Sequence, residues 1–258
     1  MHAAYELVND AGRGAAVVLC DHATNAVPAS VAGGDLGLPA AEMERHIAWD
    51  IGARGVSLAL AEALDAPALL TRFSRLVIDP NRGEDDPTLV MRLYDGAIVP
   101  GNRGVDDAEV ERRLAAWHRP YHAAIDRLID TRLAEGRPPA LVAIHSFTPR
   151  LVGRAPRPWH VGVLHGADMR LAGALLARLR AEPDLCVGQN QPYAGELEGD
   201  TLSRHGTRRR MRHVLIELRQ DLIAEPDGQR AWAARLAPML TAAIAETEAA
   251  AREENDHG

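Results

Sequence analysis

The chain has 258 residues with 29 basic and 36 acidic side chains, a formal net charge of −7. It contains no lysine, which excludes Schiff-base chemistry and a P-loop lysine because both need an amine. The acidic balance argues against nucleic acid as a partner, and the two cysteines cannot form a disulfide framework. No signal peptide or membrane span is recognisable. We expect a cytoplasmic protein of one domain over residues 1–258, with a polar tail at about 252–258.

Short apolar runs alternate with helical patterns. In chain order we predict a strand at 15–20, a helix at 40–64, strands at 68–70 and 76–78, a helix at 106–135 with a kink at Pro120, strands at 140–144 and 159–164, a helix at 169–179, strands at 185–187 and 213–218, and a helix at 231–251. Residues 83–104 are expected to form one long functional loop. The pattern predicts an α/β fold with a mixed, mostly parallel sheet flanked by helices.

Polar side chains follow several predicted strands. His22 comes soon after the first strand, Asn81 and Arg82 follow the strand at 76–78, and His145 follows the strand at 140–144. Glu217 lies inside the last strand. Ligands of doubly wound sheets gather at the carboxyl ends of the strands, so we expect these side chains to converge on one edge.

Two histidines that leave neighbouring strands, His22 and His145, are typical of a zinc site that a carboxylate or amide oxygen completes. A catalytic zinc ion with three protein ligands leaves one position for water and lowers the pKa of that water toward about 7. Glu217 is suited to accept the water's proton, because a carboxyl on a buried strand is destabilising unless it faces a polar cavity. The alternatives are structural histidines and a Glu217 that pairs with Arg75 or Arg219.

Seven segments carry a resemblance to a known family. They are CDHATNAVP at 20–28, HIAWDIG at 46–52, FSRLVIDPNR at 73–82, IHSFTP at 144–149, NQPYAG at 190–195, HG at 205–206 and VLIELRQDL at 214–222. Together they resemble the N-formylglutamate amidohydrolase family. The resemblance implies a hydrolase with one zinc ion per chain and a small acidic N-acyl amino acid as substrate. The prototype reaction is N-formyl-L-glutamate plus water giving formate and glutamate, a late step in histidine degradation.

A more distant similarity is to zinc carboxypeptidases, which implies a fold of the phosphorylase/hydrolase-like kind. Their pattern has a His-x-x-Glu pair, an Asn-Arg pair for a substrate carboxylate, an Ile-His-Ser ligand and a Glu-Leu-Arg base. The counterparts here are His22 with Asn25, Asn81 with Arg82, His145, and Glu217 with Arg219.

The third metal ligand departs from the carboxypeptidase pattern, because Asn25 stands where that pattern has a glutamate. An amide oxygen is a weaker zinc ligand than a carboxylate. We therefore expect His22, Asp50 and His145 to hold the metal, with Asn25 as the alternative or as a partner of a ligand. Asp21 is a further candidate, although adjacent side chains on a strand point apart.

The remaining candidates would bind substrate or stabilise charge. Arg82 with Asn81 would hold the substrate carboxylate, and Arg75 would stabilise the oxyanion or a second carboxylate. Arg219 could also bind that second carboxylate. The alternative for these arginines is pairing with carboxylates that order the 83–104 loop. Further candidates for substrate binding are Tyr193, as a lid residue, and His205.

Two rival functions remain open. One is a zinc peptidase, or a deacylase of another N-acyl amino acid. The other is a non-catalytic relative that binds a metal or an acidic metabolite. Neither a membrane nor nucleic acid is an expected partner, and the sequence leaves the oligomeric state open.

Overall fold

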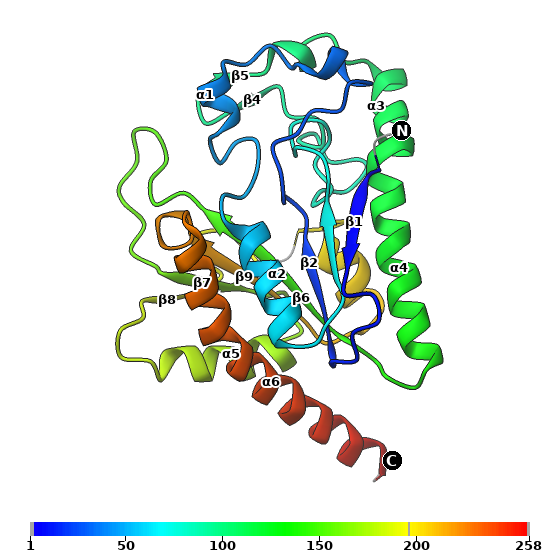
Figure 1. The fold of residues 1–258 in the computed structure, drawn as a ribbon, viewed down its shortest axis with the longest axis vertical. Coiled ribbons are helices and arrows are strands. Elements are labelled where there is room, and N and C mark those ends of the chain that lie inside the picture. The colour runs from blue at the N-terminus through cyan, green and yellow to red at the C-terminus, as the bar shows by residue number, and fades with distance from the viewer. Residues whose placement is uncertain (1–2, 196, 257–258) are drawn as a thin grey trace.

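The computed structural model describes residues 3–195 and 197–256. Its centre is a seven-stranded sheet in the order β1-β3-β2-β6-β9-β7-β8 (Figure 1). The strands are β1 (Tyr5–Val8), β2 (Ala16–Cys20), β3 (Ala68–Thr71), β6 (Ala140–Phe147), β7 (Val161–Leu164), β8 (Val187–Gln189) and β9 (His213–Arg219). Strands β3, β2, β6 and β9 are parallel, whereas β1 and β7 pair antiparallel with β3 and β9. The predicted α/β class, with its mixed and mostly parallel sheet, is confirmed.

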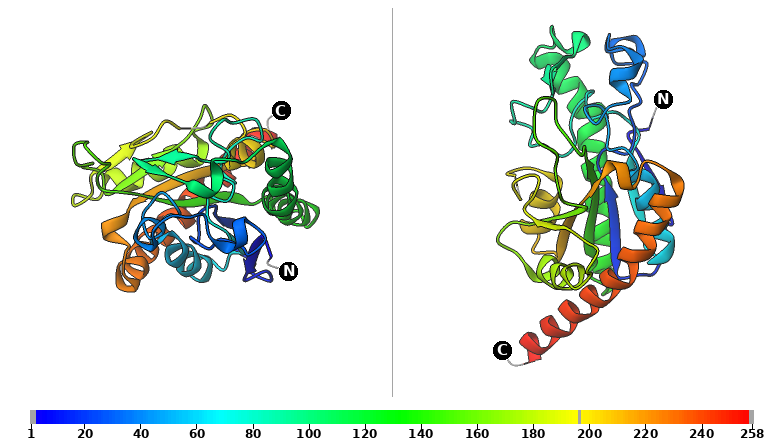
Figure 2. Two further views of the ribbon diagram at one scale, coloured as in Figure 1. Left: turned by 90° about the horizontal axis from the view of Figure 1, so that it is seen from above. Right: turned by 90° about the vertical axis from the view of Figure 1, so that its left-hand side faces the viewer.

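Helices cover both faces of the sheet (Figures 1 and 2). Helices α2 (Ala53–Ala63), α5 (Arg170–Arg180) and α6 (Pro226–Asp256) pack on one face, and α4 (Arg119–Ala134) packs on the other. Along β2, Val18 and Cys20 face the first layer, whereas Val17 and Leu19 face α4. Side chains alternate along a strand, so a strand covered on both faces reads as one continuous apolar run.

The same alternation positions polar residues of β6 and β9. Ala143 and Leu215 face the α4 side of the sheet. His145 and Glu217 come two residues later on their strands and therefore lie on that same face. They are also direct register partners. The sheet alone thus brings a histidine and a carboxyl side by side near the carboxyl ends of two parallel strands.

The single helix predicted over 40–64 is wrong. The segment forms α1 (Ala40–Met43), a series of turns, and α2. Its apolar residues belong to two separate clusters, with Ile47 in one and Val56 in the other. Gly52, just before α2, has a φ of 81°, and a Cβ there would lie 2.1 Å from the Ile223 carbonyl oxygen. Only glycine fits this turn, which ends the segment that carries Asp50.

The strand predicted over 76–78 is also wrong. Leu76 and Ile78 are fully buried in an apolar cluster, which explains the strand-like pattern, but the backbone turns here. Ser74 drives the turn, because its Oγ accepts a hydrogen bond from the Leu76 amide and its carbonyl accepts one from the Val77 amide. The turn leads directly into the segment Asp79–Arg82.

The helix predicted over 106–135 is confirmed with an interruption. Helix α3 (Asp107–Arg113) begins after Asp106, whose side chain accepts from the Glu109 amide, and a π-helical turn at Leu114–His118 connects it to α4. The interruption falls just before Pro120, which lacks an amide donor. The 83–104 loop contains a small hairpin, β4 (Leu93–Tyr94) and β5 (Ala97–Ile98), that was not predicted.

Helix α6 extends beyond the end of the sheet (Figure 2) and runs to Asp256, so most of the predicted tail is helical. The last two residues of that tail lie outside the described residues. Strand β1 was also not predicted. Within 3–195 and 197–256, no helix is long and apolar enough to cross a membrane.

Candidate metal centre

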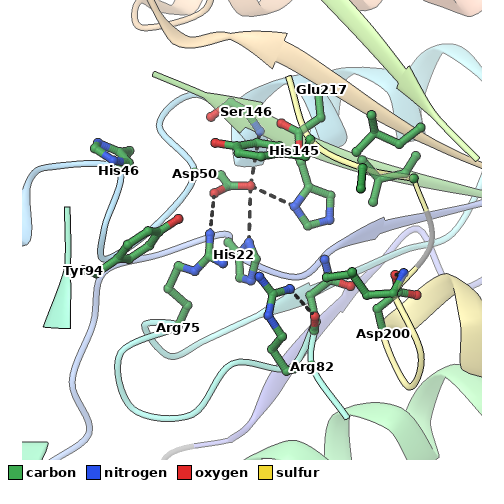
Figure 3. Close-up of a pocket in the computed structure, with 17 residues that line it drawn as sticks. His22, His46, Asp50, Arg75, Arg82, Tyr94, His145, Ser146, Asp200 and Glu217 are labelled. Carbon is green, nitrogen blue, oxygen red and sulfur yellow. Dashed lines mark hydrogen bonds and ion pairs between the residues drawn. The ribbon is translucent and has the colours of Figure 1, made fainter. Parts of the chain in front are cut away.

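A cavity of about 250 Å³ lies at the carboxyl ends of the central strands (Figure 3). Open α/β sheets bind their ligands at this edge. The predicted site residues that line the cavity are His22, Asp50, Arg75, Asn81, Arg82, His145, Tyr193 and Glu217.

Three buried side chains converge in this cavity. One ligand atom each from His22, Asp50 and His145 lie within 4.8 Å of one another. Oδ2 of Asp50 lies 3.3 Å from Nδ1 of His22 and 2.9 Å from Nδ1 of His145. The two imidazole rings are nearly perpendicular, at 79°. A histidine pair and a carboxylate in this arrangement could bind a metal ion.

Backbone contacts fix the carboxylate of this triad. The Asp50 amide donates to the His22 carbonyl at 3.0 Å, which ties the turn before α2 to the end of β2. The Ser146 amide donates to Asp50 Oδ2 at 3.2 Å. Arg75 Nη1 lies 3.6 Å from Asp50 Oδ1. Asp50 is therefore held in place by segments that are far apart in the sequence.

Two further carboxylates contact the Nε2 atoms of the two histidines, on the side of each ring away from Asp50. Asp79 Oδ1 lies 2.7 Å from Nε2 of His22, and Asp21 Oδ2 lies 3.1 Å from Nε2 of His145. Asp21 Oδ1 also accepts from the Tyr121 hydroxyl at 2.7 Å. Burial opposes the negative charge of Asp21, yet the hydrogen bond from His145 holds its pKa below the usual range. Carboxylates in this position fix the tautomer and orientation of metal-binding histidines.

The donor set fits a divalent cation. When His22 and His145 are neutral and donate from Nε2 to Asp79 and Asp21, each ring directs its Nδ1 lone pair toward an oxygen of Asp50. Hydrogen-bond acceptors whose lone pairs face one another in a buried site repel one another unless a cation or a proton lies between them. Two imidazole nitrogens and one carboxylate oxygen are an ordinary set of three protein ligands for a catalytic metal.

Arg75 takes part in the pairing predicted as its alternative. Its Nη2 and Nε donate to Asp79 Oδ2 at 2.7 and 3.1 Å. Burial disfavours the charge of Asp79, but the Arg75 guanidinium holds the pKa of that carboxyl well below its usual range. Arg75 also lines the cavity, with its guanidinium 5.5 Å from the centre of the Tyr94 ring. Arg75 therefore holds the Asp79 carboxylate in place and also faces the cavity.

Glu217 is the acid–base candidate that the structure places in the cavity. Its side chain is buried, and Oε2 has no hydrogen-bond partner among the described residues. Burial raises the pKa of Glu217 to about 7. A carboxyl with a pKa near neutrality is suited to exchange protons with a bound reactant.

Arg82 lies on the opposite side of the cavity from Glu217 (Figure 3), and it forms a wall of the cavity together with the adjacent Asn81. Asn81 Oδ1 accepts from the Thr201 amide at 3.1 Å, which leaves the NH₂ group of Asn81 as the donor for a ligand. Arg82 donates through Nε to Thr88 Oγ1 and through Nη1 to the Asn81 carbonyl. Neither bond uses Nη2 of Arg82. This wall can supply N–H donors to a carboxylate.

Tyr193 lines the cavity from the loop after β8. Its hydroxyl accepts from Arg157 Nη1 at 3.1 Å, and the guanidinium lies 4.9 Å from the centre of its ring. Burial raises the pKa of Tyr193 above its usual value, so the hydroxyl keeps its proton and can donate.

Three predicted site residues are not among the lining residues. Asn25 donates to the Met43 carbonyl and to Glu44, which favours Asp50 over Asn25 as the third ligand. Arg219 ends β9 and pairs with Asp221, so it does not reach the cavity. His205 is fully buried behind the wall, where it contacts His122 and Asp126 and not the cavity.

Four lining residues with polar or aromatic side chains were not predicted as site residues: His46, Tyr94, Ser146 and Asp200. His46 precedes Asp50 by four residues in the segment HIAWDIG, a position that could have signalled it. Tyr94 reaches the cavity from the small β4–β5 hairpin. Asp200 accepts from the amides of Leu197 and Ser203, so loop geometry alone brings it there.

Comparisons with known proteins identify the family of this chain. The sequence matches the N-formylglutamate amidohydrolase family over residues 14–224. An N-formylglutamate deformylase of Pseudomonas aeruginosa is 30% identical over 202 residues, which cover 72% of this chain and 75% of that protein.

Two solved structures are similar along most of the chain. That of a gene product of Agrobacterium tumefaciens has a TM-score of 0.90 at 36% identity, with 96% of this chain and 97% of that chain covered. The crystal structure of an N-formylglutamate amidohydrolase of Ralstonia eutropha has a TM-score of 0.65 at 25% identity, with 98% and 100% covered. The chain described here belongs to the N-formylglutamate amidohydrolase family.

Proposed function

We propose that this protein is a zinc-dependent amidohydrolase that cleaves an acidic N-acyl amino acid, with N-formyl-L-glutamate as the substrate and formate and L-glutamate as the products. The observation that carries the proposal is the shared cavity of His22, Asp50, His145 and Glu217. A metal-ligand set beside an unpartnered carboxyl is what hydrolysis of an amide needs. A hydrolytic reaction of this kind would place the protein in histidine degradation.

The metal would be held by Nδ1 of His22, Nδ1 of His145 and a carboxylate oxygen of Asp50. Two nitrogens and one oxygen suit zinc, which accepts imidazole and carboxylate ligands. When bound, the ion would polarise the formyl carbonyl and lower the pKa of water to about 7.

Glu217 would move the protons. Its Oε2 is free of hydrogen bonds to described residues, and its pKa of about 7 lets the carboxyl both accept and return a proton near neutral pH. We infer that Glu217 accepts a proton from the attacking water and delivers it to the nitrogen of the leaving amino acid. Arg75, beside the metal ligands, would stabilise the negative charge that develops on the formyl oxygen.

Asn81 and Arg82 would hold the substrate. Nη2 of Arg82, which takes part in neither of the two Arg82 hydrogen bonds described above, and the NH₂ group of Asn81 present donors to one carboxylate of the amino acid. Tyr193 would donate a hydrogen bond from the other side of the cavity. Arg82 is on the far side of the triad from Glu217 (Figure 3). A substrate whose carboxylate is bound by Arg82 would therefore place its acyl group between Arg82 and Glu217.

A substrate panel tests this proposal. N-formyl-L-glutamate, N-formyl-L-alanine, N-acetyl-L-glutamate and a dipeptide are compared by kcat/KM in zinc-loaded protein. We expect N-formyl-L-glutamate to give the highest value. Arg82→Gln should raise its KM by about 10–100-fold, the loss of a charge-assisted hydrogen bond.

The matched control is Arg103→Gln, an exposed arginine in the 83–104 loop that follows Arg82, and this variant should leave KM unchanged. Faster turnover of the dipeptide would instead favour a peptidase. Faster turnover of another acyl amino acid would favour a different deacylase. Stoichiometric metal with no turnover would indicate a binding protein.

A further inference from the structure

Three buried histidines lie directly behind the wall that carries Asn81 and Arg82. His118 is in the π-helical turn before α4, His122 is in α4, and His205 is in a second π-helical turn at Ser203–Thr207. All three are almost completely shielded from solvent. Nothing in the proposed reaction uses them.

Two of these histidines form a chain of hydrogen bonds with an acceptor at each end. His122 Nε2 lies 2.9 Å from the Pro80 carbonyl oxygen, and His122 Nδ1 lies 2.8 Å from His205 Nε2. His205 Nδ1 lies 3.0 Å from Asp126 Oδ1. The carbonyl oxygen can only accept, and the ionised carboxylate can only accept.

The two acceptors at the ends of this chain, the Pro80 carbonyl and the Asp126 carboxylate, determine how many protons the chain needs. The three contacts need three ring protons, because neither terminal oxygen supplies one. Two neutral imidazoles carry only two. The His122–His205 pair must therefore hold one additional proton and a positive charge, which the carboxylate of Asp126 balances.

Burial and the neighbouring His118 oppose a positive charge on His122, because they hold its pKa well below its usual range. The balancing carboxylate of Asp126 lies 3.0 Å from Nδ1 of His205, at the other end of the chain from the Pro80 carbonyl. His118 donates from Nε2 to the Arg82 carbonyl, and its Nδ1 has no partner among the described residues, so it is neutral. The other polar groups that face the pair are Tyr121, Arg204 and Arg209, of which Arg209 also pairs with Asp126.

We infer that His122 and His205 are positioning residues that hold the Asp79–Arg82 segment through a shared, positively charged hydrogen-bond chain ending at the Pro80 carbonyl. His118 adds a second contact at the Arg82 carbonyl. The chain thus fixes the backbone on both sides of Asn81. Only the effect on substrate binding rests on the proposed function, whereas the proton count rests on the three distances.

Loss of the additional proton would break one of the three contacts. With two protons left, the contact without a proton is the one with the Pro80 carbonyl, the one between the two rings, or the one with Asp126. In each case the hydrogen-bond chain from Asp126 to the Pro80 carbonyl is interrupted, so the wall loses support. The metal should stay bound, because Asp79 is also held by two hydrogen bonds from Arg75.

Asp126 offers a test that spares the fold, because its side chain is half exposed. In Asp126→Asn the amide can rotate and donate to His205 Nδ1, so the chain is complete with two neutral rings. The matched control is Asp130→Asn, one turn later on α4. This substitution also removes a negative charge and an ion pair with Arg209, but it leaves the contact of His205 with Asp126 intact.

The experiment is NMR of zinc-loaded, ¹⁵N-histidine-labelled protein from about pH 6 to about pH 10, across and above the ordinary histidine pKa. His205→Asn assigns the signals. We expect a histidine with both ring nitrogens protonated in the wild type and in Asp130→Asn, and none at that position in Asp126→Asn. The backbone amide of Asn81, in the same peptide unit as the Pro80 carbonyl, should titrate together with the ring signal in the wild type.

Kinetics provide the second measurement. The wild-type KM for N-formyl-L-glutamate should rise about tenfold through the same titration, the equivalent of one hydrogen bond, whereas Asp126→Asn should show no such rise. His160→Asn, which removes a half-buried histidine outside the chain, should behave like the wild type.

Neutral rings at both positions in the wild type would overturn the inference, as would loss of the signal in Asp130→Asn. If the protein turns over no acyl amino acid, the ring and Asn81 signals still decide the proton count. In that case the proposed function fails and the inference is judged on NMR alone.

Discussion

The carboxylate of Asp79 lies 2.7 Å from Nε2 of His22, on the opposite edge of the ring from the nitrogen that faces Asp50. Asp21 occupies the same position behind His145. A hydrogen bond there makes the imidazole more basic and keeps its lone pair directed at the metal position. The candidate metal site thus combines three residues that could bind a metal with two carboxylates that orient the two histidines among them.

Asp21 and Asp79 should therefore increase the affinity of the site for its metal. Asp21→Asn should weaken zinc binding by about 10–100-fold while the protein stays folded. Isothermal titration calorimetry against a competing chelator measures this, with the exposed Asp10→Asn as the control. Unchanged affinity in Asp21→Asn would remove Asp21 from the metal site.

The third ligand can be tested with two variants. Asp50→Asn should lose stoichiometric zinc, because the carboxylate oxygen lies nearest both histidine Nδ1 atoms. Asn25→Ala should keep it, because the Asn25 amide is bonded to Met43 and Glu44 away from the cavity. Elemental analysis of dialysed protein gives the zinc content. The reverse result would make Asn25 the ligand.

Glu217 should be needed for turnover but not for metal binding. Glu217→Gln keeps the shape of the side chain and removes its ability to accept a proton, so kcat should fall by about 10²–10⁴-fold. Zinc content should be unchanged, and Glu62→Gln, an exposed glutamate on α2, should behave like the wild type. Full activity of Glu217→Gln would exclude the carboxyl from the reaction.

Glu217 should also make the metal-free protein less stable as pH rises. Its pKa of about 7 lies above the ordinary 4.5, so between these values the native state holds a proton that the unfolded state releases. The free energy of unfolding therefore falls as pH rises through this range, and the full loss is present above about pH 7.

Thermal unfolding in the presence of a chelator measures this effect. Glu217→Gln should have a higher Tm than the wild type at about pH 8 and nearly the same Tm at about pH 4. A wild type that is more stable than the variant at the higher pH would show that the buried carboxyl is not destabilising.

The sheet and part of the site could be predicted because the alternation of side chains along a strand indicates both the strands and the faces on which their polar residues lie. His145 and Glu217 follow apolar runs whose alternation fixes the face on which each side chain lies. The position of Asp50 depended on a different feature. Asp50 lies in the turn before α2, and this turn ends at Gly52, where a carbonyl of distant Ile223 excludes any Cβ. This contact has no local signature in the apolar pattern.

Two predicted substrate-binding residues, His205 and Arg219, do not line the cavity, because other contacts hold their side chains. His205 has the residue type of a substrate ligand, but π-helical backbone turns it toward His122 and Asp126. Arg219 follows Glu217 by two positions, yet Asp221 binds its guanidinium outside the cavity. The contacts of His205 join segments far apart in the sequence, which a local pattern does not contain, whereas Arg219 and Asp221 are only two residues apart.

The central claim is that the triad and Glu217 together hydrolyse an acyl amino acid. The most direct measurement is formate release from N-formyl-L-glutamate by zinc-loaded protein and by the same preparation stripped with a chelator. We predict release that is lost on stripping and restored by zinc. Folded, zinc-loaded protein that releases no formate would contradict the account, and so would release that persists after complete removal of metal.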